Sequence, residues 1–298
     1  MKKTLLNLML LSNVYWGNAI AGEMNSPNPI KESVKTFMGF YAGINGGYAF
    51  ANTKTLRTNS QNIQYCTAAQ GCSGGDMISS ISATSASKAF SLNKTSFLGG
   101  GELGYNQKVY KEYILGLETD IQGFGSGKQR DSSSSNVSFV VGNAPQSIST
   151  NLKISKNIDF LGSLRGKLGY LVKPNIFIYG SGGLAYGNVS SKTSVQQNYG
   201  FPANINSVVN DWGSTGKYSN TRIGFSFGGA IDWMFRANLS AKFEYLYYNL
   251  GKVSYHSGNL ADAFIVPNTP QNYFTNTMST TTRFDGNILR LGLNYHFA

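Results

Sequence analysis

The sequence predicts an all-β fold: an eight-stranded antiparallel transmembrane β-barrel with short turns at one end and four long loops at the other. Three observations predict it. Eight segments alternate apolar and polar residues with the period of two that strands show. The connections between them alternate between short and long. Only 13% of the 298 residues are charged, against 35 Gly, 18 Tyr and 18 Phe, a composition typical of strands in a bilayer.

The first residues of the chain predict export. Lys2 and Lys3 precede an apolar run over residues 5–16 that is too short to cross a bilayer as a helix, and the AIA at 19–21 has the form of a cleavage site. We therefore predict a signal peptide at 1–21, a disordered periplasmic leader at 22–36 and the barrel at 37–298.

The closing stretch, NILRLGLNYHFA, shows the strand pattern most clearly. Leu289, Leu291 and Leu293 share one face, while Arg290 and Asn294 share the other. Seven earlier segments repeat this alternation: GFYAGINGGYAF, SFLGGGELGY, YILGLETDIQG, IDFLGSLRGKLGY, IFIYGSGGLAYG, RIGFSFGGAIDW and LSAKFEYLYY. Each apolar face is free of charge and is expected to meet lipid, where a central cation would cost about 2–4 kcal/mol. Ile158 is assigned to this face and Asp159 to the interior.

The connections predict which end of the barrel is which. Those at 106–111, 171–175 and 234–238 are short, whereas 51–95, 124–157, 188–221 and 249–282 are long and rich in Ser, Asn, Thr and Gln. Such long loops are unusual in ordinary domains. Short periplasmic turns and long extracellular loops are typical of outer-membrane barrels.

Charged side chains of the expected strands lie on the opposite, inward face. Acids and bases balance in one layer of the interior: Glu102, Glu118, Asp120 and Glu244, with Arg165, Lys167, Lys242 and Arg290. Eight strands leave an interior that side chains just fill, and charges buried there require partners. We favour a packed core of ion pairs over the alternative, a narrow gated pore lined by the same residues.

Few residues suggest chemistry in the expected loops. Cys66 and Cys72 predict a disulfide that closes a small loop, because an exported protein enters an oxidising compartment. Tyr255 and His256, at the root of the last loop, are candidate ligands of haem iron, since both residue types can bind it. We find no convincing catalytic triad, dyad or metal cluster and expect no enzyme activity. The formal charge is +11, but the sequence shows neither a nucleic-acid-binding motif nor a clustered basic face, one of which nucleic-acid binding requires.

The motifs GLETDIQG, FLGSLRGKLGY, AKFEYLYYNLG and NILRLGLNYHF resemble the small outer-membrane barrel family. That family includes OmpA-type membrane domains, opacity-like surface proteins and the major outer-membrane antigens of alphaproteobacteria. The resemblance implies a place in the cell outer membrane, contact with its lipid and lipopolysaccharide, and a structural role with loop-mediated contact to a host surface or to haem. The alternative that it implies is a small-solute porin.

Overall fold

The computed structural model describes residues 37–51, 56–66, 75–92, 95–125, 128–141, 143–200, 210–266 and 269–297. All of them lie in one compact unit, Lys35–Ala298. The predicted signal peptide and leader, 1–36, lie outside these residues. In the part of the chain that the structure describes, no helix has the length and apolar character needed to cross a bilayer.

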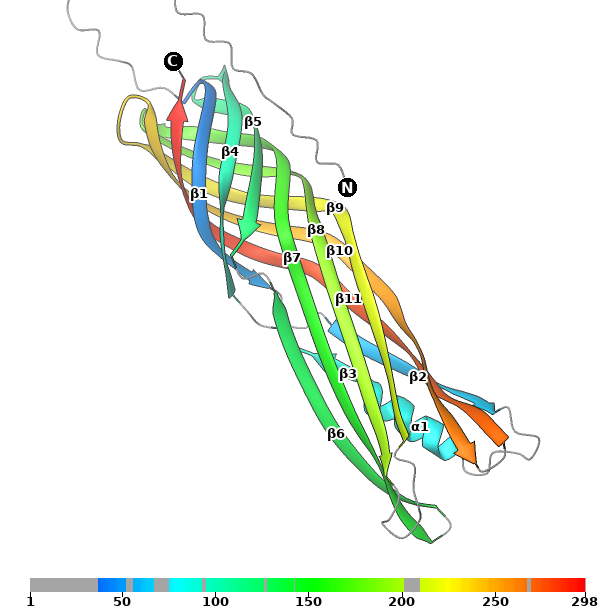
Figure 1. Cartoon of the computed structure of the whole chain (residues 1–298). Coiled ribbons are helices and arrows are strands. Elements are labelled where there is room, and N and C mark those ends of the chain that lie inside the picture. Colours follow the sequence, from blue (N-terminus) through cyan, green and yellow to red (C-terminus); the bar gives the residue numbers. More distant parts are fainter. Residues whose placement is uncertain are drawn as a thin grey trace, which may run out of the picture. The chain divides into compact units, whose positions relative to one another are not determined.

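Eight antiparallel strands close into a ring (Figure 1). Their order is β1, β4, β5, β7, β8, β9, β10, β11, and β11 pairs back with β1. The ring strands are β1 (Gly39–Ala51), β4 (Thr95–Tyr110), β5 (Tyr113–Phe124), β7 (Ala144–Lys173), β8 (Ile176–Gly200), β9 (Asn210–Met234), β10 (Leu239–Val266) and β11 (Thr269–His296). The turns between β4 and β5, β7 and β8, and β9 and β10 lie at one end of the ring, which we name the turn end.

At the other end, β7 to β11 run on past β1, β4 and β5 (Figure 1). We name this part the extension. It also holds β6 (Gln129–Val141), which pairs with β7; β2 (Leu56–Cys66), which pairs with β11; β3 (Lys88–Phe90); and α1 (Gly75–Ala86).

The extension corrects the prediction of four long loops. Most of 124–157, 188–221 and 249–282 is paired strand, and 51–95 contains β2, α1 and β3. The physical reason is a second period-two pattern with inverted polarity. On β7, Ile148, Leu152 and Ile154 are buried, while Asn151 and Lys153 are exposed. These strands bury an apolar face and expose a polar one. The Ser and Asn residues of the exposed face gave them the composition of loops.

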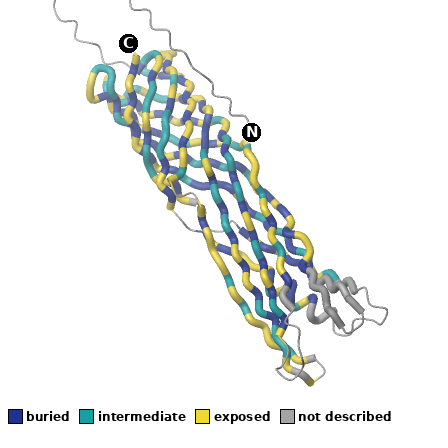
Figure 2. Tube along the Cα trace, in the orientation of Figure 1, coloured by how far each residue is buried: buried dark blue, intermediate teal, exposed yellow. Residues whose placement is uncertain are grey.

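The ring itself has the opposite polarity, and buried and exposed residues alternate along its strands (Figure 2). Large apolar side chains point outward, among them Ile44 at 69%, Leu117 at 62%, Ile223 at 72% and Leu291 at 65% exposed. We name this exposed apolar surface the outer belt. Aromatic residues mark its turn end, including Tyr105, Tyr113, Tyr170, Trp233 and Tyr295, as expected of side chains at a membrane interface.

The two polarities meet on β7 at a β-bulge. The register of β7 with β8 shifts between Ile158 and Phe160, which leaves Asp159 unpaired in the ladder. Ile158, predicted to face outward, is therefore buried at 8% exposure, and Asp159, predicted to face inward, is exposed and hydrogen-bonded to Asn157 and Asn188. Both predictions were wrong because one extra residue reverses every face beyond it.

Candidate functional site

The interior of the ring brings together all eight predicted lumen residues, and each is at most 5% exposed. We name this set the charge layer: Glu102 on β4, Glu118 and Asp120 on β5, Arg165 and Lys167 on β7, Lys242 and Glu244 on β10, and Arg290 on β11. Its four acids and four bases come from five strands, so the layer ties distant segments of the chain together.

Arg165 contacts three carboxylates at once. Its Nη2 lies 2.5 Å from Glu118 Oε1 and 2.7 Å from Asp120 Oδ2, and its Nη1 lies 2.5 Å from Glu244 Oε1. The hydroxyls of Ser163 and Ser181 accept its remaining hydrogen bonds at 2.9 and 3.0 Å. A planar guanidinium suits this role because its donors form a fixed fork.

Arg290 joins β11 to the same acids. Its Nε donates to Glu244 Oε2 at 2.7 Å, and its Nη2 lies 2.9 Å from Asp120 Oδ2. Lys167 completes the layer beside Glu118 at 3.4 Å. Each buried charge thus has a partner of opposite sign, which offsets its desolvation.

Three carboxylates of the layer have oxygens within 4.8 Å of one another, a spacing that a metal ion could bridge: Glu102, Glu118 and Glu244. Lys242 already forms ion pairs with all three. Its ammonium group supplies the positive charge that these acids require, so the cluster is better explained as a salt-bridge network than as a metal site.

Sequence reasoning missed two polar members of the interior on β1. Tyr41 donates from its hydroxyl to Glu118 Oε2 at 2.5 Å and accepts from Lys167 Nζ at 2.5 Å. Asn45 donates from Nδ2 to Glu102 Oε2 at 3.0 Å. The available signal was their alternation with Ala42 and Ile44, which were assigned outward.

Clusters of apolar side chains pack across the ring on both sides of the charge layer, beside buried polar residues such as Asp232 and His296 toward the turn end and Gln122 toward the extension. Toward the turn end lies the lower apolar layer: Phe37, Ile114, Phe177, Tyr179, Ala230 and Met234. Toward the extension lies the upper apolar layer, which includes Leu98, Leu161, Ala185, Leu246, Leu250, Phe284 and Ile288. A single strand shows this order. On β11, Ile288 and Phe284 lie beyond Arg290 in the direction of the extension, and both are at most 1% exposed.

The extension has a packed interior of its own around α1. Gln197, fully buried, donates from Nε2 to Thr150 Oγ1 at 2.9 Å and to the Ser82 carbonyl at 2.9 Å. Its Oε1 accepts from Trp212 Nε1 at 2.7 Å and from Ser82 Oγ at 2.6 Å. Buried amide groups of this kind are fully satisfied only in one arrangement, so Gln197 fixes α1 against β7, β8 and β9.

A buried lysine lies where the extension begins. Lys156 is 4% exposed, donates to the Arg283 carbonyl at 2.5 Å and lies over the Phe284 ring, with Nζ 4.8 Å from its centroid. Burial lowers the pKa of Lys156 to about 8, opposed by the charge of Asp285. Its outward neighbours Asn157 and Ser155 are polar, so this group lies beyond the outer belt.

The structure does not bring the two candidate haem ligands together. Tyr255 is 7% exposed, and its hydroxyl lies 2.8 Å from both Ser191 Oγ and Thr193 Oγ1. His256 is exposed on the other face of β10. Cys66 ends β2, whereas Cys72 lies outside the described residues, and the predicted disulfide with it.

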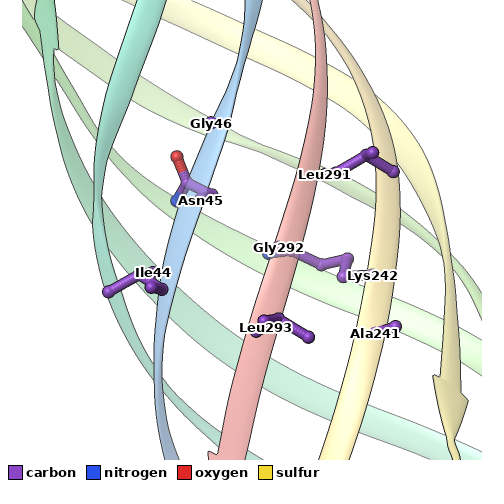
Figure 3. A pocket seen from close by; sticks show the side chains of 8 residues that line it. All are labelled: Ile44, Asn45, Gly46, Ala241, Lys242, Leu291, Gly292 and Leu293. Atoms are coloured by element: carbon purple, nitrogen blue, oxygen red, sulfur yellow. The ribbon is translucent and has the colours of Figure 1, made fainter.

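A shallow hollow of about 560 Å³ indents the outer belt across β1, β10 and β11 (Figure 3). Ile44, Leu291 and Leu293 line it on the outer side, and Gly46 and Ala241 make room for it. Asn45 and Lys242 also contribute to its lining, but most of the lining is apolar and suits lipid acyl chains.

Comparison with known proteins adds a location. The chain is 26% identical over 292 residues to the 31 kDa outer-membrane immunogenic proteins of Brucella melitensis and Brucella suis, across 97% of this chain and 95% of each relative. No family model matches.

The chain is an outer-membrane protein. The near-complete alignment with outer-membrane relatives and the outer belt agree on this, and the location predicted from the sequence is confirmed.

Solved structures show a weaker likeness. Ail of Yersinia pestis is 10% identical with a TM-score of 0.27, and OprG of Pseudomonas aeruginosa is 8% identical with a TM-score of 0.37. The alignments cover 87% of this chain in both cases, with 100% of Ail and 97% of OprG. At such low scores neither structure establishes a shared activity.

Proposed function

We propose that this chain is an eight-stranded transmembrane β-barrel, closed to solutes, that stabilises the outer membrane and holds its extension outside the cell for contact with a host surface or ligand. In this orientation the short turns face the periplasm. The outer belt supports the bilayer position, because exposed apolar side chains surround the ring. The polar outer face of the extension supports its position in water.

The layers inside the ring favour a closed barrel over a porin. A conducting lumen needs a continuous water-filled path, whereas here buried apolar side chains pack across the ring on both sides of the charge layer. The eight charges are also committed to one another. Such a layer holds strands together without passing ions.

Planar-bilayer recording of the purified protein tests this role. A closed barrel gives no steady openings at neutral pH. Steady nanosiemens-scale openings would support the small-solute porin instead. A matched variant, Ile288→Ser with Phe284→Ser, removes two apolar side chains above Arg290 and should make openings more frequent if these side chains form the seal.

Surface contact is the second part of the proposal. The Brucella relatives are named as immunogenic proteins. Immunogenicity is expected of a protein with part of its surface outside the cell. We propose no enzymatic role. Haem, if it is a ligand, would be bound by the exposed His256, because the Tyr255 hydroxyl is enclosed between Ser191 and Thr193.

A further inference from the structure

Four cations lie on the outer face of the extension, on four neighbouring strands. They are Arg130 on β6, Lys153 on β7, Lys192 on β8 and Lys217 on β9, and all four are exposed. We name them the basic row.

The register aligns the basic row across the sheet. Arg130 is opposite Ser155, Ser155 is opposite Lys192, and Lys192 is opposite Lys217. Paired residues of antiparallel strands share a face. Neighbouring strands lie about 4.8 Å apart, so the three steps from Arg130 to Lys217 span roughly 14 Å. Lys153, two residues from Ser155, widens the row along the strands.

No acid of the described residues is paired with the basic row, and the exposed Asp159, four residues from Ser155 on β7, is hydrogen-bonded to Asn157 and Asn188 instead. Within the described residues, none of its four side chains forms an ion pair. Asp131 follows Arg130, but it is opposite Ile154, whose side chain is buried, so it belongs to the other face. Like charges directly opposite each other, as Lys192 and Lys217 are, destabilise a sheet. A row of this kind costs stability in the free protein and is relieved by a ligand with several negative charges.

The position of the basic row separates it from the lipid phosphates at the membrane surface. Lys192 is eight residues beyond the belt residue Leu184, and Lys217 is six beyond Ile223. Six strand residues span about 20 Å along the strand, which at a tilt of about 35–45° gives about 15 Å along the membrane normal. This height exceeds the screening length of about 8 Å at physiological salt. The row therefore faces solution, where an extended polyanion can lie across it.

We propose that the basic row binds a sulfated polysaccharide, whose sulfate groups pair with the four cations while nearby hydroxyls, such as Ser194 and Thr215, accept or donate hydrogen bonds. This inference rests on the proposed function, since it requires the extension to lie outside the cell.

Size-fractionated heparin is the probe, titrated against the full chain in detergent. We expect binding that weakens steeply with salt, because counterions are released from the polyanion. Lys192→Gln with Lys217→Gln should weaken it about 30-fold at low salt, at roughly tenfold per 1.4 kcal/mol and about 1 kcal/mol for each cation. Lys111→Gln with Lys173→Gln, which removes the same charge at the turn end, should change it less than about 3-fold.

Equal losses in the two double variants would overturn the proposal, because net charge alone would then account for binding. Absence of heparin binding would overturn it as well. If lipopolysaccharide micelles bind the basic row and heparin does not, the ligand is a lipopolysaccharide phosphate and the polysaccharide assignment is wrong.

The orientation is tested separately on intact cells. In a chain with Cys66 and Cys72 replaced by Ser, a membrane-impermeant maleimide should label Lys192→Cys and not Lys173→Cys. Heparin binding in detergent together with the reverse labelling would contradict the proposed function and leave the chemistry of the row standing.

Discussion

Glu244 and Arg290 occupy directly opposed positions on β10 and β11, and Arg290 Nε donates to Glu244 Oε2 at 2.7 Å. The pair lies inside the closed ring, and both side chains are at most 1% exposed. The pairing of β10 with β11 thus places this ion pair in the solvent-excluded interior of the ring. The same arrangement recurs between Glu118 and Arg165 on β5 and β7, so register and charge pairing specify each other.

Removing one cation of the charge layer should strongly destabilise the ring. Arg165→Ala removes one of the two arginines that Glu118, Asp120 and Glu244 share, which leaves the layer with four acids and three bases. Breaking such buried pairs costs about 3–5 kcal/mol. Urea unfolding from lipid vesicles measures it. Lys217→Ala, at an exposed position, should stay within about 0.5 kcal/mol. Similar small effects of both changes would contradict a dry, paired interior.

The neighbouring glycines Gly182 and Gly183 of β8 should differ in how much a methyl side chain destabilises the ring. A Cβ on Gly183 would collide with the Leu164 carbonyl oxygen and lie 2.8 Å from Arg165 Cα, whereas a Cβ on Gly182 meets nothing closer than 3.9 Å. Gly183→Ala should destabilise the ring by about 1–3 kcal/mol through overpacking, and Gly182→Ala by less than about 0.5 kcal/mol. Heat-modified mobility on gels compares the two. A larger effect at Gly182 would place the crowded face on the outside of the ring.

The extension should depend on Gln197. Gln197→Leu keeps much of the volume but leaves Trp212 Nε1 and Ser82 Oγ without the acceptor they share, at about 1–3 kcal/mol for each buried polar group. Protease digestion of intact cells should then cleave the extension sooner, while the ring stays protected. Gln196→Leu, at an exposed position, is the control. An unchanged cleavage rate in Gln197→Leu would mean that α1 is held in another way.

The stability of the extension should rise with pH above neutrality. The pKa of Lys156 is about 8 when folded, below its ordinary value of 10.5. Between these values the unfolded chain binds more protons, so the free energy of unfolding increases with pH, by about 3 kcal/mol across the whole window. Urea midpoints from pH 7.5 to 9.5 should rise in the parent chain and remain flatter in Lys156→Met. Parallel curves for the two proteins would assign the pH dependence to other groups.

Haemin titration should separate the two candidate ligands. Tyr255→Phe should leave any Soret shift unchanged, because the hydroxyl lies between Ser191 and Thr193. His256→Ala should abolish it. A shift that survives His256→Ala and disappears in Tyr255→Phe would show that β10 rearranges on binding.

The ring and its charge layer follow from the alternation of residues, because a strand in a bilayer has two environments and a phase error is costly. Arg165 and Glu244 could be placed inside for this reason. The extension was not predicted, since Ile148, Leu152 and Ile154 alternate with polar residues in the opposite phase, and Ser-rich strands resemble loops in composition. The bulge at Asp159 has no local signature, and Ile158 was misplaced with it.

Labelled cysteines along β7 measure where the outer face of this strand changes from apolar to polar. In a chain with Cys66 and Cys72 replaced by Ser, single cysteines at Leu164, Leu168, Lys153 and Ser155 carry a fluorophore in vesicles that contain brominated lipid. We expect strong quenching at Leu164 and Leu168, and none at Lys153 and Ser155. Quenching at Lys153 equal to that at Leu164, or none at either belt position, would show that the polarity of β7 does not reverse between the ring and the extension.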